Sequence, residues 1–110
     1  MELNRMDYDA YDDIIAWENI LDELESDEEK LLRLKKYLER REQEIINTVD
    51  FNKLYGKNND KIRRYHVQRV LKNTMTDKDN LELKITRDKR MIEFLKATVA
   101  VKIEYMRLEE

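Results

Sequence analysis

The second half of the chain carries a long stripe of mostly apolar positions. The steps between them alternate between three and four residues, which is the spacing of a coiled-coil seam. The stripe consists of Val67, Leu71, Thr74, Lys78, Leu81, Ile85, Asp88, Ile92, Leu95, Val99, Lys102 and Met106. Three of its members are charged, and charges at seam positions can fix the register of helices or the number of partners. The pattern predicts one continuous helix over residues 60–109, straight or bent, of which the part from Asp60 to Leu108 would be roughly 73 Å long at about 1.5 Å per residue. A break near Asn73, with a new cap at Thr76 and Asp79, is the alternative, because residues 73–80 are poor in helix formers.

The first half of the chain carries two shorter apolar sets at helical spacing. They are Ile14, Trp17, Leu21 and Leu24, and then Leu31, Leu34, Leu38, Ile45 and Val49. Between the two sets, Ser26 is followed three residues later by Glu29, which is the pattern of a capping box at a helix start. We therefore expect an acidic helix over residues 1–25 and a second helix over residues 27–55. A continuous helix through Ser26 is the alternative, because no residue nearby forces a break.

The chain has one glycine and no proline. Gly56 follows Leu54 and Tyr55, and glycine ends helices readily because it adopts the left-handed conformation at little cost. Asn58, Asn59 and Asp60 come next and are good residues to cap a new helix. These features predict a turn over residues 56–59.

The predicted elements define an all-α fold, either an elongated antiparallel helical hairpin or a three-helix bundle with coiled-coil packing, in one domain over residues 1–110. Two isolated helices would leave much of each apolar stripe in water, whereas a homodimer or higher oligomer would cover it. The residues that we expect to mediate self-association are Leu71, Leu81, Ile85, Ile92, Leu95 and Val99.

The net charge of −3 conceals strong charge segregation. Residues 1–29, which we call the acidic arm, contain twelve acidic residues and one basic residue, whereas residues 51–73 contain seven basic residues and one acidic residue. We use the name basic tip for one set of side chains around the predicted turn: Lys53, Lys57, Lys61, Arg63, Arg64, Tyr65, Arg69 and Lys72.

The basic tip is compatible with three kinds of partner. Its cations can neutralise phosphates and its tyrosine can stack on an unpaired base, as in nucleic-acid-binding proteins. It can also bind an acidic protein, or the acidic arm of the same chain. A fourth interpretation is that these side chains are simply solvated.

The residues needed for catalysis or metal binding are scarce. The chain has a single histidine, His66, a single serine, Ser26, and no cysteine, so neither a nucleophile–base pair nor a thiolate site is predicted. The acidic residues Asp7, Asp9, Asp12 and Asp13 lack the glycine and the spacing of an EF-hand. We expect no enzyme activity, no cofactor and no metal. No apolar run is long enough to span a membrane, which favours a cytoplasmic protein.

The segment around Gly56 and the helix after it resemble small coiled-coil proteins of phages and prophages of Gram-positive bacteria. The resemblance covers about residues 45–100 and rests on Asp50, Phe51, Gly56, Asn59, Lys61 and Arg63. It implies a mobile-element setting, in which small helical proteins bind host proteins or assist DNA metabolism, and it supplies no catalytic residue. We therefore expect a non-enzymatic protein-interaction module that self-associates. The alternative is a nucleic-acid-associated accessory protein that binds through the basic tip.

Overall fold

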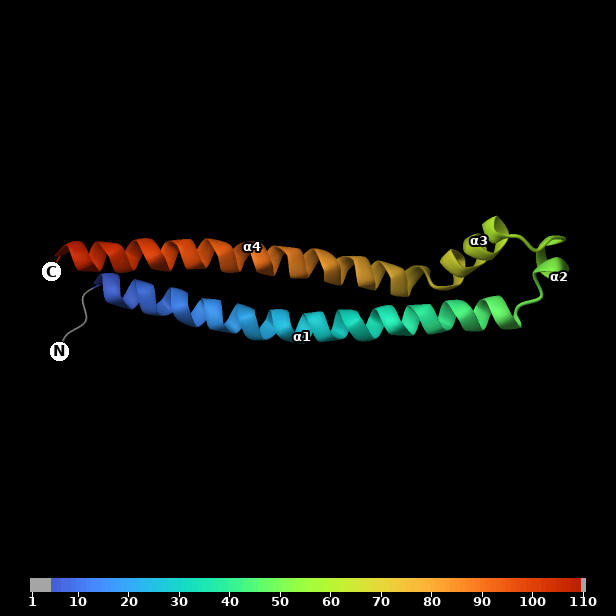
Figure 1. Cartoon of the computed structure of the whole chain (residues 1–110), viewed down its shortest axis with the longest axis horizontal. Coiled ribbons are helices and arrows are strands. Elements are labelled where there is room, and N and C mark those ends of the chain that lie inside the picture. Colours follow the sequence, from blue (N-terminus) through green and yellow to red (C-terminus); the bar gives the residue numbers. More distant parts are fainter. Residues whose placement is uncertain (1–4, 110) are drawn as a thin grey trace. The chain divides into compact units, whose positions relative to one another are not determined.

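The fold is all-α in the part of the chain that the structure, a computed structural model, describes: the backbone of residues 5–109 and the side chains of residues 11–108. Four helices follow one another, α1 (Arg5–Thr48), α2 (Phe51–Tyr55), α3 (Asp60–Val70) and α4 (Lys72–Glu109), and this part of the chain contains no strand (Figure 1). The predicted all-α class is confirmed.

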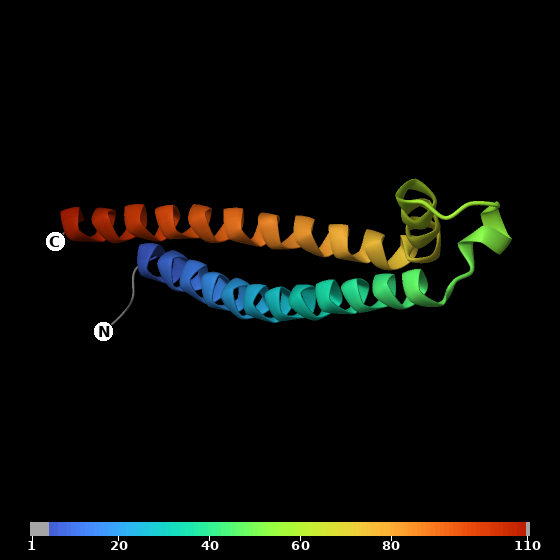
Figure 2. The same cartoon turned by 45° about the vertical axis from the view of Figure 1, so that its right-hand side comes forward.

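The chain divides into two compact units. Unit 1 comprises Met1–Glu28 and Leu83–Glu110, and unit 2 comprises Glu29–Glu82. Within each unit, a stretch of α1 lies antiparallel to a stretch of α4 (Figures 1 and 2), so the predicted helical hairpin is confirmed as well. No helix within residues 5–109 combines the length and the apolarity needed to cross a membrane.

Helix α1 continues through Ser26, so the predicted break there is wrong. The side chains that α1 turns away from solvent keep alternating steps of three and four across this point: Asp13, Trp17, Ile20, Leu24, Asp27, Leu31, Leu34, Leu38, Arg41 and Ile45. The apolar pattern is interrupted at Ser26 because the next seam position is an aspartate, Asp27, which is buried and binds Lys84. One seam residue also differs from the prediction, since Ile20 is half-buried while Leu21 is exposed.

The predicted second helix over residues 27–55 is in fact the end of α1 followed by the short helix α2. Val49 and Asp50 separate the two, and the Asp50 carboxylate accepts a hydrogen bond of 3.0 Å from the backbone N–H of Lys53, which caps α2. Gly56 ends α2 in the left-handed conformation with φ +72°. Asn59 then caps α3, because its side-chain oxygen accepts a hydrogen bond of 2.9 Å from the N–H of Ile62.

The predicted helix over residues 60–109 is divided at Leu71 into α3 and α4, so the prediction of one continuous helix is also wrong. In Figure 2, α3 turns sharply away from the axis of the first turns of α4. Leu71 leaves helical geometry (φ −101°, ψ 13°), although its N–H still donates to the carbonyl of Val67 at 2.9 Å. The bend brings Val67 and Leu71 into the same core as Phe51. Burial of these side chains therefore explains the bend.

The core of unit 2 surrounds Phe51, which is only 1% exposed. Its other buried members come from α1, α3 and the bend: Leu38, Ile45, Val67 and Leu71. In unit 1, α4 buries Ile85, Ile92, Leu95 and Val99. Trp17 of α1 is half-buried in the same unit, with the Lys96 ammonium 5.9 Å from the centroid of its ring.

Candidate interaction surfaces

The basic tip lies in unit 2, on α2, the turn after Gly56, α3 and the first residue of α4. Seven of its eight predicted side chains are exposed: Lys53, Lys57, Lys61, Arg64, Tyr65, Arg69 and Lys72. Among the described residues, none of the six exposed cations forms an ion pair. Their charge is therefore available to a partner in solution.

Arg63, the eighth member, is half-buried and engaged at the start of α3. Its guanidinium donates to the side-chain oxygen of Asn58 at 2.5 Å and to the carboxylate of Asp60. These bonds hold the turn against the first turn of α3, so Arg63 has mainly a structural role. Sequence reasoning grouped it with the exposed cations because charge alone does not distinguish them.

Contacts among four aromatic rings join α2 to α3. The hydroxyl of Tyr55 and Nδ1 of His66 share a hydrogen bond of 2.6 Å, and the His66 ring stands edge-on to Phe51 with centroids 5.6 Å apart. Tyr65 packs edge-on against Tyr55 at 6.2 Å and remains exposed. His66 thus has a polar partner and an aromatic environment that suit a structural residue, while the Tyr65 ring faces water and can stack on a ligand.

The acidic arm supplies partners for lysines of α4 within unit 1. Asp13 accepts a bond of 2.5 Å from Lys102, and Glu28 lies 3.5 Å from Lys89. Two of the charged seam positions noted in the sequence, Asp88 and Lys102, thereby have opposite charges beside them, because Lys84 lies 3.6 Å from Asp88. Acidic residues of the arm therefore contribute to the pairing of α1 with α4 in unit 1.

Lys84 is the centre of a cluster of acids in unit 1. It donates to the buried carboxylate of Asp27, and its ammonium lies 3.1 Å from Glu23. The hydrogen bond from Lys84 to Asp27 raises the pKa of the Lys84 ammonium above its ordinary value, and the hydrogen bond from Lys84 to Glu23 raises it further. Lys84 is therefore held in its charged form.

The residues predicted to mediate self-association lie largely inside the chain's own core. Leu71, Ile85, Ile92, Leu95 and Val99 are buried, and Leu81 is half-buried. Sequence reasoning did not distinguish a seam filled by the same chain from one filled by a second copy, since both require the same spacing. A surface that binds another chain must therefore be sought among the exposed residues.

Helix α4 exposes a second stripe in unit 1, which we call the outer face. It follows alternating steps of four and three and consists of Arg87, Met91, Phe94, Thr98, Val101, Tyr105 and Leu108, all exposed except the half-buried Thr98. Five of these are large apolar or aromatic side chains that the chain leaves exposed, with Phe94 at 65% and Leu108 at 75%. The stripe lies mostly one residue before the buried seam, and its spacing is a signal that sequence reasoning missed.

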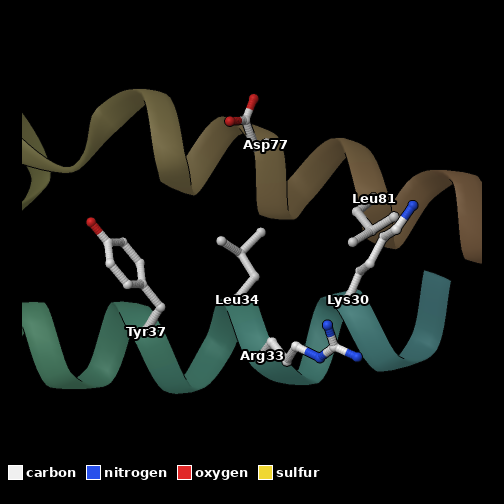
Figure 3. A pocket seen from close by; sticks show the side chains of 6 residues that line it. All are labelled: Lys30, Arg33, Leu34, Tyr37, Asp77 and Leu81. Carbon is white, nitrogen blue, oxygen red and sulfur yellow. The ribbon is translucent and has the colours of Figure 1, made fainter. Parts of the chain in front are cut away.

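Two open grooves lie on the helix surfaces. One, of about 500 Å³, lies on the outer face and is lined by Arg87, Arg90, Met91 and Phe94. The other, also of about 500 Å³, lies in unit 2 between α1 and α4 (Figure 3) and is lined by Lys30, Arg33, Leu34, Tyr37, Asp77 and Leu81. In Figure 3, Leu34 and Tyr37 point from α1 toward α4, whereas Asp77 points away from α1. Neither lining includes a histidine or a serine, so neither groove has the parts of a nucleophile–base pair.

The described residues contain no group of three or more histidine, aspartate or glutamate side chains arranged to hold a metal ion. Comparison with known proteins gives no further guide, because no protein-family model, curated protein or solved structure matches the chain. The functional argument therefore rests on the surfaces described above.

Proposed function

We propose that this protein is a non-enzymatic protein-interaction module that self-associates. The observation that carries the proposal is the outer face of α4, where Met91, Phe94, Val101, Tyr105 and Leu108 stay exposed after the chain has packed its own seam. Contiguous exposed apolar residues on a soluble protein mark sites of protein–protein contact. The resemblance to coiled-coil phage proteins supports the same role in a mobile-element setting.

The spacing of the outer face supports a helical partner. Residues at alternating steps of three and four present a continuous ridge to another helix, and aromatic side chains are frequent anchors of such interfaces. From Arg87 to Leu108 the ridge is roughly 32 Å long at about 1.5 Å per residue. This length is enough for several turns of helix packing.

Sedimentation velocity over a range of protein concentrations tests the proposal. Phe94→Glu places a charge near the middle of the outer face, and we expect this variant to sediment as a monomer where the wild type sediments as an associated species. Leu32→Glu is the matched control, because Leu32 is also an exposed apolar residue within a helix (55% exposed) but lies outside the outer face. If Phe94→Glu associates as the wild type does, the outer face is not the interface.

A second candidate function is binding of nucleic acid through the basic tip. The supporting observation is that the basic tip carries six exposed cations without ion pairs among the described residues, together with the exposed ring of Tyr65. Cations neutralise phosphates while an aromatic ring stacks on an unpaired base, which favours single-stranded nucleic acid.

Fluorescence anisotropy of labelled single- and double-stranded DNA, at low and near-physiological salt, tests this second candidate. We expect binding that weakens steeply with salt and is lost in the double variant Arg64→Glu, Arg69→Glu. Arg63 is left unchanged in this design because it holds the start of α3. Absence of binding at low salt would reject nucleic acid as the partner of the basic tip.

A further inference from the structure

We propose that the occupant of the outer face is a second copy of this chain, whose α4 packs antiparallel to the first about a two-fold axis close to Ala97. This inference rests on the proposed self-association and adds the orientation and the register. The outer face is self-complementary only in the antiparallel orientation, for reasons that lie in its charges.

Arg87 excludes the parallel orientation. It occupies one of the seam positions of the outer face, so two parallel copies in register would place two guanidinium groups opposite each other. Like charges at facing positions of an interface are unfavourable. In an antiparallel pair, Arg87 instead faces the ring of Tyr105 of the second copy, where a cation–π contact is favourable.

One register follows from this facing pair. When Arg87 faces Tyr105, the alternating spacing also sets Met91 opposite Val101 and Phe94 opposite Thr98, each pair occurring twice. The large side chains therefore face smaller ones, so that the central layers can interdigitate. Ala97 lies beside its own counterpart next to the axis, where its small side chain allows the two helices to approach closely.

The flanking charges agree with the same register. Arg90 of one copy comes beside Glu104 of the other, and the two-fold axis forms this pair twice. Among the described residues Arg90 has no ion pair, and Glu104 is engaged only in a long exposed contact of 3.9 Å with Arg107. Both side chains are therefore available for the pairing, whose main contribution is to orientation and specificity.

Single-cysteine cross-linking tests the orientation, because the chain has no cysteine of its own. Under mild oxidation we expect Ala97→Cys to form a disulfide-linked dimer, since the two copies of residue 97 lie side by side. Arg90→Cys alone and Glu104→Cys alone should form few dimers, whereas a mixture of the two should form a mixed disulfide. Glu93→Cys is the control for random collision, because the side chain of Glu93 is 75% exposed and lies off the outer face.

The possible results of this experiment distinguish a wrong register from a failure of the proposed self-association. If the protein sediments as a dimer but Arg90→Cys links to itself as fast as Ala97→Cys, the copies are parallel and the register is wrong. If the wild type is a dimer and Ala97→Cys links no faster than Glu93→Cys, a different face mediates association. If the wild type is a monomer throughout, the proposed self-association fails together with the inference built on it.

Discussion

Lys84 of α4 donates a hydrogen bond to the carboxylate of Asp27 of α1, a side chain that is only 5% exposed. Asp27 lies in the seam of α1, so it would be a costly residue to bury without this lysine. If the helices of unit 1 slipped by a heptad, Asp77 or Met91 would take the place of Lys84, and Asp27 would lose its hydrogen-bond donor. The pair therefore favours one register of α1 against α4, as polar seam residues do in coiled coils.

Replacing Lys84 should lower the stability of the fold more than replacing Asp27. Lys84→Met leaves the Asp27 carboxylate buried without its donor, so we expect a lower midpoint in urea denaturation followed by circular dichroism. Asp27→Leu instead places an apolar residue at a seam position, while Lys84 keeps Glu23 and Asp88 as neighbours. We expect Asp27→Leu to keep or raise the midpoint. A lower midpoint for Asp27→Leu than for Lys84→Met would refute this account of the pair.

Stability should fall at alkaline pH as Lys84 loses its proton. Because the folded state raises the pKa of Lys84 above its ordinary value of 10.5, the contribution of the cluster is fully present below about pH 10 and is lost as the pH rises through the folded-state pKa. Lys84→Arg keeps a positive charge at higher pH, since the guanidinium deprotonates only above about pH 12. Denaturation midpoints between pH 9 and pH 11.5 should therefore fall more for the wild type than for this variant, and parallel curves would contradict the assignment.

Phe51→Ala should destabilise the core of unit 2 strongly. Phe51 is the largest fully buried side chain in the described part of the chain, and truncation of a buried phenylalanine costs about 3–5 kcal/mol. Leu54→Ala, three residues later on the same short helix, removes an exposed side chain and should change the free energy of unfolding by no more than about 0.5 kcal/mol. Urea denaturation measures both, and equal costs would show that α2 does not pack as described.

Gly56→Ala tests the turn after α2. Gly56 has φ +72°, and a Cβ added there meets no atom within 4 Å, so the cost of the change is conformational rather than steric. We expect a loss of about 1–2 kcal/mol for alanine. Gly56→Asn should lose less, because asparagine tolerates the left-handed conformation. If alanine and asparagine are equivalent in thermal unfolding, the left-handed turn is not populated.

The helical class and the pairing of helices were predictable because the spacing of apolar residues indicates which face of a helix is buried. The break expected at Ser26 failed for a physical reason: a capping-box pattern is local, whereas the partner of Asp27 lies 57 residues away in Lys84. The position of the bend, at Leu71, was likewise not predictable, since it depends on Val67 and Leu71 reaching a core centred on Phe51.

The candidate surfaces were predictable only in part. Exposure of the basic tip agrees with its composition, but the engagement of Arg63 with Asn58 and Asp60 depends on the fold of the turn. The outer face could be identified only from the structure. Helix α4 carries two apolar stripes, and the sequence alone does not show which of them packs against the same chain. Only the burial of the first stripe in the structure shows that the second stripe stays exposed.

Sedimentation equilibrium of the wild-type protein at micromolar concentrations tests the central claim most directly. Self-association through the outer face predicts a mass near twice the 13.5 kDa of one chain, approached as the concentration rises. A mass of 13.5 kDa at every concentration, including the highest that remains soluble, would contradict the claim.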